Sequence, residues 1–183
     1  MVIKLQTPLT KEDILNLNIG DEVLLSGTIF TARDRAYKFF LENDYNRIKN
    51  SIIYHCGPIV QNNEVISAGP TTSDRVSQYT ESMIEKYNTP AFIGKGGMDG
   101  LSLEAMRGKA VYFSTVGGAA CLYAQKMKIK KADKLEFGMA EAIWEIEIKN
   151  FPAIVTMDAK GNSLHRDVYD KSKTIFEKLI NII

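Results

Sequence analysis

Hydrophobic residues recur with two different periods along this chain, and segments with one period alternate with segments that have the other. Runs rich in β-branched and apolar residues predict strands, whereas apolar residues that recur every three or four positions predict helices. The expected strands are residues 22–30, 51–57, 91–94, 109–117, 134–138 and 142–158. The expected helices are residues 11–17, 31–43, 71–88, 101–108, 118–127 and 167–183. Strand–helix units mixed with consecutive strands are typical of an α/β domain with a mixed sheet.

The ends of several elements carry their own signals. Residues 1–20 are expected to be a lead-in, in which Thr10 caps a short helix that ends near Gly20. Thr31 is placed to cap the helix that follows it, where Asp34 suits the positive first turn.

The last two elements have the strongest patterns. Trp144, Ile146 and Ile148 alternate with acidic residues, which predicts a hairpin-like strand region with one wet face. The final helix is amphipathic, and its apolar residues are expected to face the core. These residues are Val168, Ile175, Phe176 and Leu179.

Composition limits the classes of partner. A length of 183 residues fits a single domain over 1–183, and the net charge of +1 gives no field that favours nucleic acid or a membrane surface. Anion specificity must therefore come from a few placed residues. The N-terminus lacks the apolar core of a signal peptide, and no apolar run has the length of a membrane span, so we expect a cytoplasmic protein.

The cysteines and histidines predict no metal site on this chain. Cys56 and Cys121 lie far apart without a CxxC pair, so we expect both to be small buried side chains rather than a disulfide. His55 and His165 have no Asp, Glu or Cys at metal-ligand spacing.

Three segments share one pattern, in which a strand ends, small residues follow and a cation appears. They are GTIFTARD with Arg33, SAGPTTSDR with Arg75 and FIGKGG with Lys95. Ligands of α/β folds gather at such strand ends, helix N-termini attract anions, and arginine grips a carboxylate with two hydrogen bonds. Three convergent cations in a nearly neutral protein favour a small dianion as the ligand.

Each of these residues also has a simpler interpretation. Arg33 is compatible with a surface charge at a helix start, Arg75 with a solvent pair to Asp74 or Glu81, and the glycine loop with a flexible turn. Hydroxyl residues before a helix are usually caps, so at least one of Ser67, Thr71, Thr72 and Ser73 is expected to be a cap. A catalytic hydroxyl would need an activating neighbour.

The segments TARDRAYKF, YHCGPIV, SAGPTTSDR, IGKGGM and residues 138–162 together resemble the β subunit of class I fumarate hydratase. L-tartrate dehydratase β subunits and the C-terminus of the single-chain enzymes share this region. The resemblance covers roughly residues 5–180. It implies a single swivelling β/β/α domain and the reversible hydration of fumarate to malate. It also implies a site between this domain and an α subunit that carries a [4Fe–4S] cluster.

The resemblance also implies roles for individual residues. Arg33, Arg75 and Lys95 would bind substrate carboxylates or line the site, with Thr72 and Gly96 beside them. Thr71, the first threonine of the GPTT motif, would be the catalytic base.

Some residues depart from the family pattern. Ser73 and Asp74 stand where alanine and glycine are frequent, and we expect Asp74 to pair with Arg75 and weaken its grip on substrate. His55 and Cys56 replace residues that are often aromatic or aliphatic. The choice of substrate therefore stays open between fumarate and L-tartrate, and a non-catalytic dicarboxylate-binding module is a further alternative.

The cysteine count bears on the cluster. A [4Fe–4S] cluster with one open iron needs three protein thiolates, and this chain has two cysteines in total. The cluster ligands must therefore come from a partner chain, the α subunit.

Overall fold

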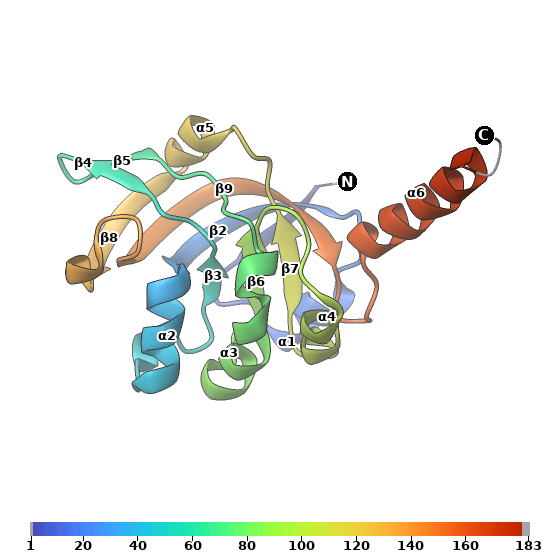
Figure 1. Ribbon diagram of the computed structural model, residues 1–183. Coiled ribbons are helices and arrows are strands. Elements are labelled where there is room, and N and C mark those ends of the chain that lie inside the picture. The colour runs from blue at the N-terminus through green and yellow to red at the C-terminus, as the bar shows by residue number, and fades with distance from the viewer. Residues whose placement is uncertain (1, 181–183) are drawn as a thin grey trace.

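The computed structural model describes residues 2–180 and has an α/β architecture. Seven strands form a mixed sheet in the order β1-β2-β3-β6-β7-β9-β8, and β9 also pairs with β2. Because β9 pairs with both β7 and β2, the sheet curls back on itself (Figure 1). The strands are β1 (Ile3–Gln6), β2 (Glu22–Thr31), β3 (Ile52–Tyr54), β6 (Ala91–Gly94), β7 (Val111–Ser114), β8 (Met127–Asp133) and β9 (Ile143–Met157), with β4 (Ile59–Gln61) and β5 (Glu64–Ser67) as a separate pair.

Four neighbouring strands run parallel and set the position of the candidate site. β2 pairs with β3, β3 with β6 and β6 with β7, each in parallel. The carboxyl ends of these strands therefore lie at one edge of the sheet, where ligands of α/β folds usually bind. β9 runs antiparallel to β2, β7 and β8, which makes the sheet mixed as expected.

Alternate residues of the parallel strands face two separate cores. Ile53 of β3 and Phe92 of β6 pack in the core beneath the helices. Ile52 and Ile93, their neighbours, pack in a second core with residues of β2 and β9. All four side chains are fully buried, as is typical of parallel strands that are covered on both faces. The layers are therefore helix, sheet and sheet, which agrees with the β/β/α order that the family resemblance implies.

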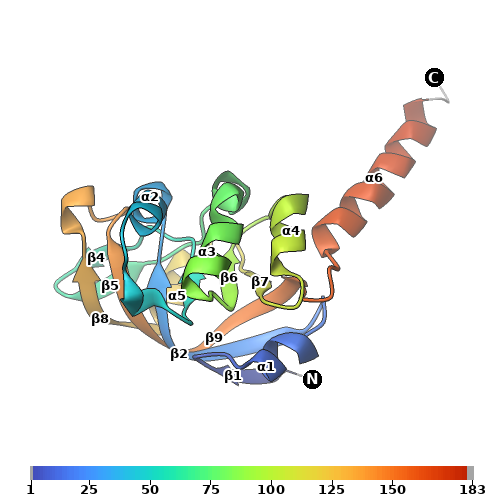
Figure 2. The same cartoon turned by 90° about the horizontal axis from the view of Figure 1, so that it is seen from below.

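Three helices lie in a row on one face of the parallel strands (Figure 2). They are α2 (Asp34–Glu42), α3 (Thr80–Tyr87) and α4 (Gly100–Met106). The remaining helices are α1 (Lys11–Asn16), α5 (Ala120–Ala124) and α6 (Leu164–Ile180), with 3-10 helices over Asn46–Ile48, Asp74–Tyr79 and Leu135–Phe137. Within residues 2–180, no helix has both the length and the apolar content to cross a membrane.

The helix predictions are confirmed at α1 and α3. Thr10 caps α1 in a reciprocal capping box with Asp13, in which each side chain accepts a hydrogen bond from the backbone N–H of the other. The apolar face predicted over 71–88 is buried, although the first part of that segment is a 3-10 helix rather than an α-helix.

The segment between α5 and β9 differs from the expectation. The predicted strand over 134–138 is wrong, because Leu135–Phe137 is a 3-10 helix between Lys134 and Gly138, both with left-handed φ. The strand in this part of the chain is β8, which precedes the predicted range. The helix predicted over 118–127 is observed only as the shorter α5. β8 is rich in lysine, and its lysines are exposed, so its sequence lacks the apolar run from which strands are usually predicted.

The hairpin-like arrangement expected within 142–158 is also wrong. β9 continues as one strand along β2, and Asn150, with a φ of 50°, lies at an irregularity in the pairing and not in a turn. A bulge bends a strand without reversing it. The predicted alternation is confirmed, since Ile146 and Ile148 are buried and Glu147 is exposed.

Two predictions about element ends need correction. The first twenty residues are more than a lead-in, because β1 pairs in parallel with β2 at the edge of the sheet. Thr31 does not cap α2, whose N-cap is Arg33. Thr31 is instead a buried residue of β2, and its Oγ1 accepts a hydrogen bond from the backbone N–H of Trp144 at 3.1 Å.

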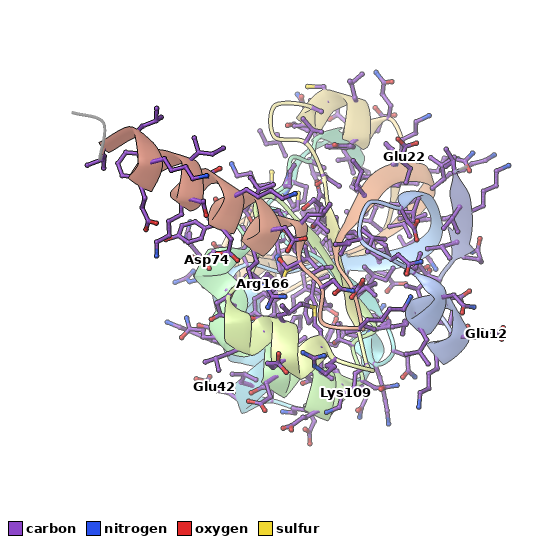
Figure 3. All side chains as sticks on the ribbon, turned by 90° about the vertical axis from the view of Figure 1, so that its right-hand side faces the viewer. Glu12, Glu22, Glu42, Asp74, Lys109 and Arg166 are labelled. Atoms are coloured by element: carbon purple, nitrogen blue, oxygen red, sulfur yellow. The ribbon has the colours of Figure 1, made fainter. Side chains whose placement is uncertain are left out.

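The last helix extends away from the rest of the molecule, and its side chains stand in open space around it (Figure 3). The expectation that its apolar face packs on the core is wrong. Val168, Ile175, Phe176 and Leu179 are all exposed, by 58–62%. An amphipathic pattern predicts that a helix has an apolar face, but it does not predict what covers that face.

Candidate functional site

The carboxyl ends of three parallel strands carry the residues that the motifs single out. Arg33 comes shortly after β2, His55 directly follows β3, and Lys95 directly follows β6. Since these strands are parallel neighbours, the Arg33 and Lys95 motifs meet at one edge of the sheet, beside His55.

Residues 70–73 insert between the ends of β3 and β6 like a short additional strand. The backbone N–H of Thr71 donates to the carbonyl of His55 at 2.7 Å, and the N–H of Lys95 donates to the carbonyl of Thr71 at 3.2 Å. The N–H of Ser73 donates in turn to the carbonyl of Lys95 at 3.2 Å. The backbone at Thr71 is therefore fixed to both neighbouring strands.

Arg33 is held at the start of α2 by a carboxylate that sequence reasoning missed. Its Nε lies 3.4 Å from Oε1 of Glu141, and both side chains are largely buried. The other oxygen of Glu141 accepts the backbone N–H of Arg35 at 3.0 Å. The contact with Glu141 is made by Nε, and no hydrogen bond within residues 2–180 engages the two terminal amines of Arg33, so they can still bind a substrate carboxylate. The available signal was the acidic residue in the GMAEA segment.

Arg75 lies in the 3-10 helix over Asp74–Tyr79 and pairs with the aspartate of the first motif. Its Nη2 lies 3.1 Å from Oδ2 of Asp34, and its side chain is 60% exposed. The expected pairs of Arg75 with Asp74 or Glu81 are wrong. An exposed pair of this kind is worth about 1 kcal/mol or less, so Asp34 can release Arg75 to a competing anion at small cost.

Lys95, Thr72 and Gly96 lie together on the open side of this edge. All three are exposed, and Lys95 has no ion-pair partner within the part of the chain that the structure describes. Thr72 and Lys95 are bridged in parallel, so they are neighbours across the inserted segment. Gly96 has a φ of 71°, a left-handed conformation that glycine adopts without strain.

The prediction that a hydroxyl of the GPTTS segment caps the next helix is wrong. The N-cap of the 3-10 helix is Ser73, and its side chain makes no capping hydrogen bond. The hydroxyl of Thr71 has no hydrogen-bond partner among residues 2–180, although the residue is half-buried. The simplest structural explanation for this threonine is therefore removed.

The surface that joins these residues is open. The hollow lined by Arg33, Asp34, Thr71, Thr72, Arg75 and Val76 encloses only about 10 Å³. That is room for about one water molecule, whereas small-molecule sites usually enclose several hundred cubic ångströms. This chain therefore presents one wall of a site, and a bound dicarboxylate would need a second wall.

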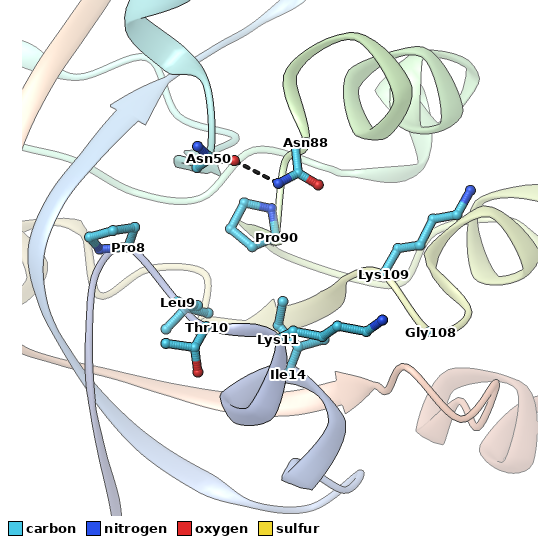
Figure 4. A pocket seen from close by; sticks show the side chains of 10 residues that line it. All are labelled: Pro8, Leu9, Thr10, Lys11, Ile14, Asn50, Asn88, Pro90, Gly108 and Lys109. Atoms are coloured by element: carbon cyan, nitrogen blue, oxygen red, sulfur yellow. Dashed lines mark hydrogen bonds between the residues drawn. The ribbon is translucent and has the colours of Figure 1, made fainter.

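A larger cavity of about 420 Å³ lies at the opposite edge of the sheet (Figure 4). Asn50, Pro90 and Lys109 line it from the segments just before β3, β6 and β7. It therefore lies at the amino ends of the strands that carry the candidate residues at their carboxyl ends. Its size alone does not make it the substrate site, because none of the three motifs reaches it.

A buried chain of hydrogen bonds lies below the inserted segment. Tyr37 Oη lies 2.6 Å from Nε2 of His55, and Nδ1 of His55 lies 2.7 Å from Oγ of Ser73. Ser73 Oγ also lies 2.7 Å from Oη of Tyr112. Two of the departures from the family pattern, His55 and Ser73, are thus hydrogen-bonded to each other. Burial raises the pKa of the Tyr37 and Tyr112 phenols and lowers the pKa of His55 to about 3.

This low pKa predicts how acid affects stability. The ordinary pKa of histidine is about 6.5, so between about pH 6.5 and pH 3 the unfolded chain binds a proton that folded His55 does not. The free energy of unfolding should therefore fall as the pH drops below about 6.5, by up to about 1.4 kcal/mol per pH unit from this residue. His55→Gln should show a shallower slope in urea unfolding measured between pH 6.5 and pH 4.5. Equal slopes for the two proteins would contradict the assignment.

The thiols of this chain do not fit a [4Fe–4S] cluster. Cys56 is buried, and burial raises the pKa of its thiol to about 12. Cys121 is exposed on α5, so the expectation that both cysteines are buried is wrong for this one. No group of three or more His, Cys, Asp and Glu side chains within residues 2–180 is arranged to hold a metal ion. Two thiols are too few for a cluster that needs three.

Comparisons with known proteins agree on one family for this chain. Residues 1–168 match the model of the family described as the fumarase C-terminus. A putative class I fumarate hydratase of Geobacillus stearothermophilus is 42% identical over 186 residues, which cover 97% of this chain but 36% of that protein. A putative L(+)-tartrate dehydratase subunit beta of Methanocaldococcus jannaschii is 40% identical over 191 residues, covering 96% of this chain and 95% of that protein. The L(+)-tartrate dehydratase subunit beta of Escherichia coli strain K12 is 35% identical over 171 residues, covering 87% and 85%.

Proposed function

The chain belongs to the fumarase C-terminus family, and on that premise we propose that it is the β subunit of a two-subunit iron–sulfur hydro-lyase that interconverts fumarate and malate. The family resemblance that the sequence motifs indicate is confirmed. The observation that supports the proposal most strongly is the meeting of Arg33, Thr71, Arg75 and Lys95 at one edge of the sheet.

The cations of this surface suit a dicarboxylate. Arg33 offers two terminal amines and is oriented by Glu141, while Arg75 is only weakly paired with Asp34. Lys95 adds a third positive charge beside them. We assign these three residues to the two carboxylates of the substrate, where they would also stabilise the negative charge that develops during proton transfer. Thr72 and Gly96 would line the same surface.

We assign to Thr71 the transfer of the proton at the substrate carbon. Its hydroxyl is half-buried and unbonded within residues 2–180, and its backbone is fixed to that of Lys95. A neutral hydroxyl is a weak base, so it needs a neighbouring group to activate it. The adjacent lysine is the candidate in this chain.

A partner chain is part of the proposal. The open hollow leaves the substrate half enclosed, and the thiols of this chain do not fit the cluster. We therefore propose that an α subunit holds the [4Fe–4S] cluster, whose iron supplies Lewis-acid chemistry, and that it covers the surface of Arg33, Thr71, Arg75 and Lys95. The two unpaired thiols favour a reducing, cytoplasmic location.

L-tartrate is the second candidate substrate. The relatives named as tartrate dehydratase subunits match this chain over most of their own length, whereas the chain spans only about a third of the fumarate hydratase relative. Hydroxyl groups distinguish tartrate from malate, and the contacts that recognise them would lie partly on the partner.

The test is anaerobic turnover by the assembled complex. The α and β chains are co-purified without oxygen, and kcat/KM is measured for fumarate, malate and L-tartrate, with the β chain alone as the control. The proposal predicts that fumarate and malate give the higher values. A higher kcat/KM for L-tartrate would show that L-tartrate, and not fumarate or malate, is the substrate. Dicarboxylate binding without turnover would favour the non-catalytic dicarboxylate-binding module.

A further inference from the structure

The buried hydrogen-bond chain connects three strands directly below Thr71. His55 directly follows β3, Tyr112 belongs to β7, and Ser73 belongs to the inserted segment. His55 and Ser73 are fully buried and Tyr112 has no exposed surface. The proposed catalytic surface uses none of these three side chains.

Ser73 and Thr71 are separated by one residue, and their side chains have different surroundings. The hydroxyl of Ser73 contacts His55 and Tyr112 in the interior, whereas Thr71 lies at the hollow on the surface. Only Thr72 separates the two residues, and the backbone of this short segment is hydrogen-bonded to His55 on one side and Lys95 on the other, so holding the side chain of Ser73 also restrains Thr71.

The backbone around the same residues reinforces this connection. The N–H of His55 donates to the carbonyl of Ile93 at 2.8 Å, and its carbonyl accepts from Thr71 at 2.7 Å. His55 therefore bonds to β6 and the inserted segment through its backbone, and to α2 and Ser73 through its ring.

Gly94 provides the space for this arrangement. A Cβ at this position would lie 1.9 Å from Oγ of Ser73 and 3.1 Å from Nδ1 of His55. A larger residue would therefore push Ser73 out of its place. Only a residue without a side chain lets Ser73 reach both of its partners.

We propose that His55 and Ser73 are positioning residues that hold Thr71 and Lys95 in fixed register at the carboxyl edge of the sheet. The inference rests on the proposed function, in which Thr71 and Lys95 contact the substrate. Moving Thr71 would break hydrogen bonds in a buried region, where an unsatisfied polar group is costly. Arg33 and Arg75, two of the three residues assigned to the carboxylates, are outside this hydrogen-bond chain, so the effect falls on turnover more than on carboxylate binding.

The main test compares two buried serines. Ser73→Ala removes the centre of the chain. Ser102→Ala removes a buried hydroxyl on α4 that bonds the carbonyl of Ser77 and the hydroxyl of Thr80 and makes no hydrogen bond to the buried chain. In the assembled complex, Ser73→Ala should lower kcat on the order of 10-fold to 100-fold, the scale of a small misplacement of a reacting group, with KM within about twofold of wild type. Ser102→Ala should lower the melting temperature by a similar amount and leave kcat unchanged.

A second measurement does not depend on turnover. Amide hydrogen exchange of the isolated full-length chain should be faster at Thr71 and Lys95 in Ser73→Ala than in wild type or in Ser102→Ala. Tyr112→Phe removes only the last hydroxyl of the chain and should give a smaller change in the same direction, which provides a milder variant if Ser73→Ala does not fold.

These results separate the two proposals. A wild-type complex that turns over no dicarboxylate would end the proposed function, and the exchange rates would still decide the positioning role. Unchanged exchange at Thr71 and Lys95 in Ser73→Ala and Tyr112→Phe would overturn the positioning role. A fall in kcat equal to that of Ser102→Ala would also overturn it, because the effect would then be a general loss of stability.

Discussion

Replacing Thr71 by alanine is expected to lower kcat of the assembled complex by roughly 10²–10⁴, the scale of general acid–base catalysis, with little change in melting temperature. The structure gives the reason for this separation. The Thr71 hydroxyl has no hydrogen-bond partner within residues 2–180, while the backbone bonds to His55 and Lys95 do not involve the side chain. Alanine therefore removes the reacting group and keeps the inserted segment in place.

Rate and melting temperature must be measured on the same preparations. Thr71→Ser keeps a hydroxyl at the same position and should retain most of the activity, so it is the matched control. A Thr71→Ala protein that melts earlier but keeps its kcat would show that the threonine has a structural role only.

Replacing Arg75 by alanine is expected to cost roughly 2–5 kcal/mol of transition-state stabilisation, the range for losing one partner of a desolvated charge pair. That corresponds to a fall in kcat/KM of about 30-fold to several thousand-fold. Its present partner, Asp34, is a weak competitor because Arg75 is 60% exposed. Arg75→Lys should also be poor, because a planar fork with two parallel hydrogen bonds becomes a point charge.

Arg107→Ala is the matched control for this prediction. Arg107 is 52% exposed and pairs with Glu104 on α4, so it resembles Arg75 in exposure and charge. Its removal should leave kcat/KM nearly unchanged. If Arg75→Ala has a kcat/KM close to that of Arg107→Ala, Arg75 does not bind the substrate.

Local patterns predict the parts of this fold that are locally determined. β2, β3, β6 and β7 have apolar, β-branched sequences. β3, β6 and β7 lie within their predicted ranges, and β2 extends one residue beyond its own. β8 was not predicted, since its alternating lysines face solvent at the edge of the sheet. The packing of α6 was predicted wrongly, because a helical period contains no information about which surface a helix meets.

The candidate site shows the same limit. The positions of Arg33, Thr71, Arg75 and Lys95 at strand ends follow from the motifs, and the parallel sheet brings them together. The motifs do not predict which residues pair with these side chains. Glu141 meets Arg33 across more than one hundred residues of sequence, and such pairings depend on the tertiary fold.

The buried chain of hydrogen bonds had a partial signal in the sequence. A histidine that directly follows an apolar strand needs a polar partner in the interior, and His55 has that position. Nothing in the sequence could identify Ser73 and Tyr37 as the partners, because the contacts to His55 come from α2 and from the inserted segment.

The central proposal is that this chain provides half of a site that a cluster-bearing α subunit completes. The most direct measurement purifies the two chains separately without oxygen, reconstitutes each with iron and sulfide, and follows fumarate hydration as one chain is titrated into the other. The two-chain proposal predicts that this chain alone is colourless and inactive, and that hydration appears on mixing and saturates. If this chain alone binds a stoichiometric [4Fe–4S] cluster or hydrates fumarate unaided, the two-chain proposal is wrong.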